Sequence, residues 1–227
     1  MLRLILVMST MMLAQAATQL SRTAITAAQP SQTTLPQMSL EGTIVDRFVR
    51  LLVTENVPGG VVTINDSCSR GEKRVDTILA GTTLDRAFDS IIKSDGRATW
   101  VAQDGVVDLL PTGSLPDLLR LPVHNFEWDK TAPADEVLGN LLQSLDITKK
   151  AKDLGLEPAI AEGGTSALCI RNCEELKRPE PLMASENDAT VLSILNRIVA
   201  AHPHTVWSYS EFDCHGNHEF EFAIVAK

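Results

Sequence analysis

The residue types best suited to chemistry gather near the C-terminus of this chain. Four histidines and one cysteine lie close together there: His202, His204, Cys214, His215 and His218. Thiolate and imidazole are the usual ligands of zinc, and alternate positions of a β-strand can bring such side chains to one face. The alternative is a polar turn, together with a histidine that caps the last carbonyls of a helix. We expect the alternative, and therefore no metal and no other cofactor.

The four cysteines, Cys68, Cys169, Cys173 and Cys214, are candidates for disulfide bonds. An even number of cysteines is typical of a disulfide framework in an exported chain. We expect a local bridge between Cys169 and Cys173, with Cys68 and Cys214 either joined to each other or free. One long bridge from Cys214 to Cys169 or Cys173 is the open alternative. The C-x3-C spacing of Cys169 and Cys173 differs from the C-x-x-C of thioredoxin-like enzymes, so no redox catalysis is expected.

No other motif indicates catalysis. The sequence has no G-x-S-x-G nucleophile elbow, and the pairs Gly59-Gly60 and Gly163-Gly164 lack the rest of a phosphate-binding loop. The formal net charge is −9, and no basic patch is visible. Because binding to a phosphate backbone needs clustered cations, DNA and RNA are not expected partners. We therefore expect a protein that is not an enzyme.

The N-terminus predicts export. Arg3 is followed by an apolar run from Leu4 to Leu13 and by Ala14-Gln15-Ala16, a small-x-small cleavage pattern. Residues 1–16 are therefore interpreted as a signal peptide, which is too short to span a membrane. Residues 17–37, rich in Thr, Ser, Gln, Ala and Pro, are expected to form a flexible lead-in. The mature protein is then periplasmic or secreted and does not span the membrane.

Two segments 107 positions apart carry the same pattern of side chains. Aligned without a gap, they place Trp100 on Trp207 and Asp89 on Asn196. Each has an apolar stripe with the spacing of one helix face, followed by a strand that contains the tryptophan. We interpret this as an internal duplication. The expected core anchors are Phe88, Ile91, Trp100, Leu195, Ile198 and Trp207.

The remaining elements follow from local signals. A helix over residues 44–54 is predicted to begin with a capping box of Thr43 and Asp46, and Asp104-Gly105 is predicted to turn a hairpin. We also expect strands at residues 61–64, 75–79, 182–183 and 123–128, helices at 134–145, 147–154 and 189–201, and a closing hairpin around residues 213–217. Asp188 is the expected cap of the last helix, and alternation in the strand 123–128 predicts that Trp128 is exposed.

These elements predict an α+β fold of two small βα-ββαβ-type modules, each with two helices packed on a short mixed sheet. The first module covers residues 38–116. The second covers residues 117–227 and carries a cysteine-containing insertion near residues 147–181.

At residues 79–89 and 100–110 the chain resembles the short N-terminal domain of secretins and TonB-dependent receptors. That family shows a short strand, a T-L-x-x-A-L-D-x-L-L helix, a strand ending in an aromatic residue, and a D-G or G-N turn into a V-x-V strand. Residues 41–111 resemble one such module, and residues 126–225 resemble a second. The resemblance implies periplasmic, non-enzymatic modules that dock onto neighbouring proteins or domains. The family is usually poor in cysteine, which this chain is not.

The sequence therefore predicts an exported binding or scaffold protein of the bacterial envelope. Its partner would be another envelope protein, contacted through strand edges that small sheets leave open. A second hypothesis is a small secreted metal-binding protein or enzyme, centred on the hairpin that contains Cys214, His215 and His218.

Overall fold

The computed structural model describes residues 34–65, 72–93, 96–159, 180–214 and 216–226. Cys68, Cys169, Cys173 and His215 lie outside these ranges, and so does the side chain of Cys214. The predicted disulfides, the signal peptide and most of the lead-in therefore fall outside the described residues. Within the described ranges, no helix is both long and apolar enough to cross a membrane.

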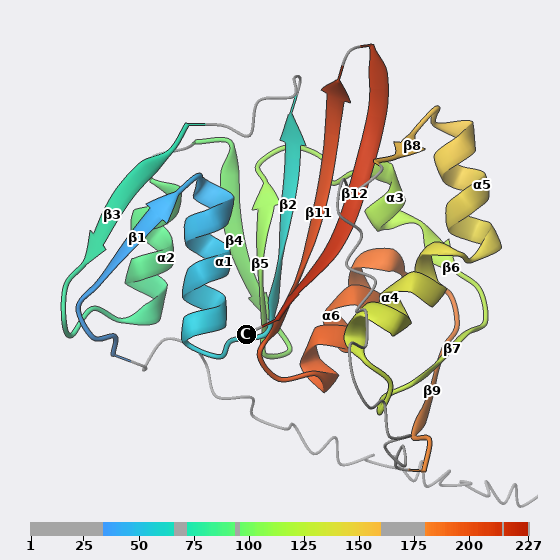
Figure 1. The fold of residues 1–227 in the computed structure, drawn as a ribbon, viewed down its shortest axis with the longest axis horizontal. Helices are drawn as coiled ribbons and strands as arrows, with labels where there is room; N and C mark the ends of the chain where they lie inside the picture. Colours follow the sequence, from blue (N-terminus) through green and yellow to red (C-terminus); the bar gives the residue numbers. More distant parts are fainter. Residues whose placement is uncertain (1–33, 66–71, 94–95, 160–179, 215, 227) are drawn as a thin grey trace, which may run out of the picture.

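The described chain has a mixed α+β fold (Figure 1). Its helices are α1 (Ile44–Thr54), α2 (Leu84–Ile92), α3 (Asp117–Arg120), α4 (Ala134–Leu142), α5 (Leu145–Asp153) and α6 (Val191–Ala201). Its strands are β1 (Met38–Gly42), β2 (Gly59–Asn65), β3 (Arg74–Ile78), β4 (Ala98–Gln103), β5 (Val106–Pro111), β6 (Pro122–Val123), β7 (Phe126–Asp129), β8 (Glu157–Pro158), β9 (Met183–Glu186), β10 (Ala189–Thr190), β11 (Thr205–Cys214) and β12 (Asn217–Ala226).

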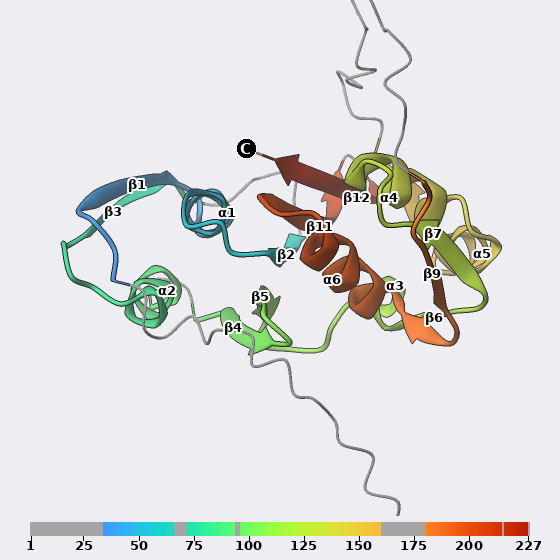
Figure 2. The same cartoon turned by 90° about the horizontal axis from the view of Figure 1, so that it is seen from below.

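A six-stranded sheet with the order β4-β5-β2-β11-β12-β8 forms the middle layer. β5, β2 and β11 run parallel to one another, β4 is antiparallel to β5, and β12 is antiparallel to β11 and parallel to β8. The pairs β1-β3, β7-β9 and β6-β10 form separate two-stranded sheets. Figure 2 shows α1 and α2 on one side of the large sheet and α4 and α6 on the other.

The central strands are buried on both faces. Val61 and its registered partner Leu109 join the hydrophobic cluster beneath α1 and α2. Val62 and Val106 join the cluster beneath α4 and α6. Successive side chains of a strand point to opposite faces, so each face of β2 and β5 supplies one cluster. Burial on both faces is the usual state of parallel strands.

Two local predictions are confirmed. The Thr43 hydroxyl accepts a hydrogen bond from the Asp46 amide at 3.2 Å, and the Asp46 carboxylate accepts one from the Thr43 amide at 2.9 Å. This capping box starts α1 at Ile44. Asp104 and Gly105, with φ of 53° and 82°, form the two-residue turn between β4 and β5.

The predictions for residues 122–145 were less accurate. Asn125, with φ of 52°, interrupts the predicted strand and separates β6 from β7. Trp128 is only 4% exposed, so its predicted exposure is wrong. β7 pairs with β9 and turns Trp128 into the cluster beneath α4 and α6. Leu145, predicted to extend α4, begins α5 instead and is 85% exposed.

The predicted cap of the last helix is also corrected. Asp188 has φ of 55° and lies outside the helix, whereas Thr190 is the N-cap of α6. The Thr190 hydroxyl accepts a hydrogen bond from the Ser193 amide at 3.2 Å. Threonine and aspartate are both favoured N-cap residues, so residue type alone did not identify the cap. The short helix α3 was not predicted.

Gly60 offers a test of the packing between β2 and β11. A Cβ atom at Gly60 would lie 1.9 Å from Cε2 of Trp207, its registered partner on β11. We expect Gly60→Ala to lower the free energy of unfolding by about 3 kcal/mol, the upper end of the usual cost of overpacking. Urea denaturation measures this change.

The matched control is Gly139→Ala in α4, because no atom lies within 4 Å of a Cβ added at Gly139. This control should raise the free energy of unfolding by about 0.5–1 kcal/mol. Equal effects of the two substitutions would contradict the close approach of Trp207 to β2.

Candidate functional site

β4 lies at one edge of the six-stranded sheet. It pairs with β5 on one side, and within the described ranges no strand pairs with its other side. The Thr112 amide donates to the Arg97 carbonyl at 2.8 Å, so Arg97 points its backbone groups toward β5. In an antiparallel pair these directions alternate along the strand. The backbone N–H and C=O groups of Ala98, Trp100 and Ala102 therefore point to the open side.

Trp100 is fixed at this edge by α2. Its indole Nε1 donates a hydrogen bond to Oδ1 of Asp89 at 2.8 Å. Its ring lies 5.4 Å from the ring of Phe88, measured between centroids, with the planes tilted by 47°. Asp85 lies one turn before Asp89 on the same helix face. The open edge thus carries a partly buried tryptophan held by one carboxylate, with a second carboxylate one helical turn away.

Trp207 makes the same kind of contact inside the sheet. Its indole Nε1 donates to Oδ1 of Asn196 on α6 at 2.7 Å, and eleven residues separate donor and acceptor in both pairs. Unlike Trp100, Trp207 is completely buried, because its ring lies across Gly60 of β2. The Asn196 amide then donates to Oδ2 of Asp108 on β5 at 2.6 Å. The Asn196 side chain therefore connects β11 with β5 across the strand β2 that lies between them.

Asp108 belongs to this network and has a strongly shifted pKa. Its side chain lies under α6 and is 6% exposed, and burial raises its pKa from 3.8 to about 7. Hydrogen bonds from the Asn196 side chain and the Gly60 backbone lower the pKa in part. Its Oδ1 has no hydrogen-bond partner among the described residues. Asp108 thus loses its proton near neutral pH, at the centre of the sheet.

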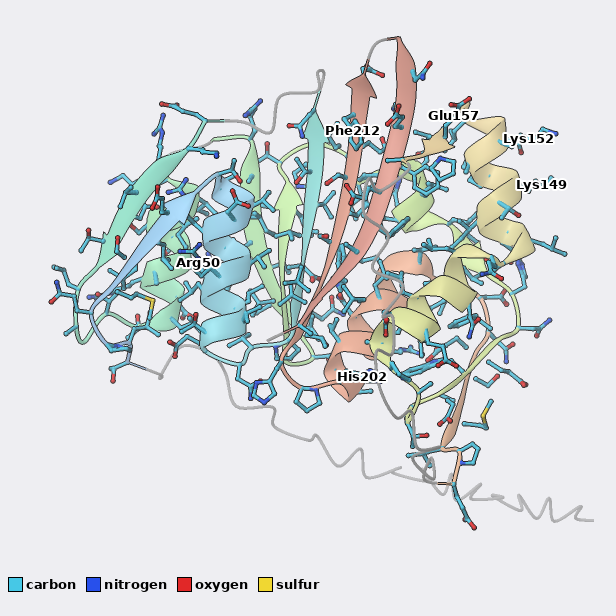
Figure 3. All side chains as sticks on the ribbon, viewed as in Figure 1. Arg50, Lys149, Lys152, Glu157, His202 and Phe212 are labelled. Carbon is cyan, nitrogen blue, oxygen red and sulfur yellow. The ribbon has the colours of Figure 1, made fainter. Side chains whose placement is uncertain are left out.

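The candidate metal ligands that the structure describes do not lie together. Both ring nitrogens of His202 lie 2.7 Å from backbone carbonyls, those of Ile198 and Ala132. His202 therefore ends α6 and ties it to the segment before α4 (Figure 3). His204, which is exposed, precedes β11 by one position. These two histidines lie at the opposite end of β11 from its turn, roughly 30 Å away for a ten-residue strand.

The turn end of the hairpin holds His218. Its Nε2 lies 3.9 Å from Oε2 of Glu211, across the β11-β12 pair. His215 and the side chain of Cys214 lie outside the described residues. Within the part of the chain that the structure describes, no three His, Cys, Asp or Glu side chains are close enough to hold a metal ion.

Two surface pockets lie elsewhere. One of about 460 Å³ lies between α5 and β8 and is lined mainly by apolar side chains, with Lys152 and Glu157 at its rim (Figure 3). The other, of about 430 Å³, lies at the start of α1. Among its arginines, Arg47 forms a buried ion pair with Asp76. That pairing neutralises a charge that an anionic ligand would need.

The expected core anchors are buried fully or in part, whereas the buried hydrogen-bond network around Asp108 was not predicted. Of the expected anchors, Trp100 is partly buried, whereas the others are fully buried: Phe88, Ile91, Leu195, Ile198 and Trp207. The roles of Gly60 and Asp108 were not predicted. The available signal was one charged residue within the apolar run Val106–Leu110, because a charge there requires a partner.

Searches against protein-family models, curated proteins and solved structures found no match to this chain. Among the described residues, β4 offers an open strand edge.

The raised pKa of Asp108 predicts a pH-dependent stability. Between pH 4 and pH 7 the unfolded chain releases this proton while the folded chain keeps it, so the contribution of Asp108 to stability is lost as pH rises. Asp108→Asn removes the titration. Relative to this variant, the parent should lose about 2–3 kcal/mol of unfolding free energy between pH 5 and pH 8. Urea denaturation of both proteins at the two pH values measures the change, and a constant difference would rule out the raised pKa.

Proposed function

We propose that this chain is an exported, non-catalytic binding or scaffold protein of the bacterial envelope. It consists of two tandem modules similar to the short N-terminal domain of secretins and TonB-dependent receptors, and it contacts a partner protein through a strand edge. The observation that carries the proposal is the parallel pairing of β2 with β11, in which one half of the chain binds the edge of the other.

The order of elements supports a duplication. Residues 38–111 run strand, helix, strand, strand, helix, strand, strand. Residues 126–226 repeat that order once α5 and the two-residue strand β10 are set aside, and α5 lies largely in the predicted insertion. The pairings also correspond, because β1-β3 matches β7-β9 and β4-β5-β2 matches β11-β12-β8. The recurrent hydrogen bond from tryptophan to Asp89 or Asn196 belongs to the same correspondence.

The directions of corresponding strands support a rotation of 180° between the two halves. β4 and β11 correspond, yet β11 runs opposite to β4, because β5, β2 and β11 are parallel and β4 is antiparallel to β5. A rotation of 180° about an axis across the strands reverses both the strand direction and the face that carries the helices. This accounts for the placement of α1 and α2 on one face and α4 and α6 on the other (Figure 2).

The local features of the resembled family also support the proposal. The short strand β3 precedes α2, which begins at Leu84 after Thr83. β4 carries Trp100, and the Asp104-Gly105 turn leads into β5. These are the features that the chain shares with the resembled family. They lie together in one unit, whose helices are enclosed between β1-β3 and the large sheet (Figure 1).

Binding by strand addition follows from the β2-β11 junction. Seven residue pairs are in register there, from Val206 opposite Gly59 to Phe212 opposite Asn65. Backbone hydrogen bonds supply affinity in such pairings, and side-chain pockets supply specificity. β4 corresponds to β11, and its outer side takes no strand within the described residues. An edge of this kind is suited to a strand of another protein.

Site-specific photocrosslinking tests the proposed function. A photoreactive residue replaces the exposed Ala102 on β4 in one variant and the exposed Lys149 on α5 in a matched control (Figure 3). We expect an adduct of discrete mass from the periplasm of expressing bacteria for position 102, and none for position 149. Adducts at neither position, or recovery of the protein only from the cytoplasm, would contradict the proposal.

A further inference from the structure

β11 pairs with β2 within the chain, and this pairing indicates which kind of strand could pair with β4. The Trp207 ring occupies the space where a Cβ of Gly60 would lie, so the residue opposite this tryptophan must be glycine. Trp100 is held by the same indole hydrogen bond, over the same spacing of eleven residues. A strand added to β4 in the manner of β2 would place one residue beneath Trp100. With the Trp100 ring placed over that strand as the Trp207 ring is placed over β2, that residue would also have to be glycine.

The two helices above these strands differ in charge. α6 lies over β11, β2 and β5, where Leu192 packs against the apolar cluster and Asn196 reaches Asp108. When the two segments are aligned with an offset of 107 residues, the positions of α2 that correspond to Leu192 and Asn196 are Asp85 and Asp89. A strand beside β4 therefore meets two carboxylates where β2 meets an apolar side chain and an amide. Lysine or arginine on that face of the strand would match them.

A second copy of this chain is a poor occupant. Its β2 is already paired on both sides, with β5 and β11. A β2-β5 pair placed beside β4 would also bring Asp108 toward Asp89, two carboxylates with no cation between them. The net charge of −9 adds repulsion between copies. The charges instead favour a basic segment from a different protein.

We propose that the open edge of β4 binds one extended segment of a partner protein that runs parallel to β4. The segment has glycine opposite Trp100 and carries lysine or arginine toward Asp85 and Asp89. Its backbone pairs with the outward N–H and C=O groups of Ala98, Trp100 and Ala102. This inference rests on the proposed function and specifies its partner.

A peptide derived from the chain provides the probe. A synthetic peptide of residues 58–65 carries Val62→Lys, because Val62 faces the helix side of β2 two residues after Gly60. Labelled peptide is titrated with the folded parent protein, and fluorescence anisotropy measures binding. We expect saturable binding, at least ~10-fold weaker when the peptide carries Gly60→Val or when Val62→Glu replaces Val62→Lys. Equal binding of the three peptides would overturn the proposal.

Substitutions in the protein test the position. Ala102→Pro removes an N–H that points away from β5 and leaves the β4-β5 hydrogen bonds in place, whereas Ala102→Val keeps this N–H. We expect loss of binding in the first variant and retention in the second, with circular dichroism confirming that both are folded. In a two-dimensional NMR spectrum, the indole N–H signal of Trp100 should shift on binding, whereas that of Trp207 should not. Binding to Ala102→Pro equal to that of Ala102→Val would overturn the proposed edge.

The peptide and the crosslink can fail separately. Absence of peptide binding, with a specific adduct still formed at position 102, would reject the glycine and lysine requirements and leave the proposed function standing. Absence of both would reject the two together.

Discussion

The contact between the Trp207 ring and Gly60 is the constraint on which the sheet depends. A tryptophan that lies flat over a neighbouring strand excludes every side chain larger than hydrogen at that point. In return the ring is fully buried, and its N–H is satisfied by Asn196, so no polar group is left without a partner at the indole. The same amide extends to Asp108, which links α6 to β11, β2 and β5 through one set of side chains.

Because the central strands are covered on both faces and paired on both sides, only the edge strands of the sheet can form backbone hydrogen bonds with another chain. On β2, Val61 joins the cluster beneath α1 and α2, and Val62 joins the cluster beneath α4 and α6. On β5, Val107 and Val106 do the same. Interior strands of this kind have their backbone groups already paired. Interaction by strand addition is then confined to outer strands, and β4 is one of them. The outer side of β2 is taken by β11, which pairs with it in the parallel direction.

Local signals predicted the described helices other than α3, the Thr43-Asp46 capping box and the Asp104-Gly105 turn, because each depends on residues only a few positions apart. The order of the six strands could not be predicted in this way. Alternation shows that one face of a strand is buried but identifies neither the face nor the neighbouring strand, and Trp128 was misplaced for this reason. The expected helix-capping histidine is confirmed, because Nδ1 of His202 lies 2.7 Å from the carbonyl oxygen of Ile198 at the end of α6. The coupling of Asp108 to Asn196 joins residues 88 positions apart, beyond the reach of any local pattern.

The difference between Asp89 and Asn196 follows from what surrounds each side chain. Either residue type can accept the indole hydrogen bond through a carbonyl or carboxylate oxygen. Asn196 must also donate to the buried Asp108, which a carboxylate cannot do, and two acids in that place would repel each other without solvent to screen them. Asp89 is exposed, so its charge costs little there. One geometry thus serves two purposes. The neutral amide lies at the junction inside the chain, whereas the exposed carboxylate suits the basic strand proposed for the edge of β4.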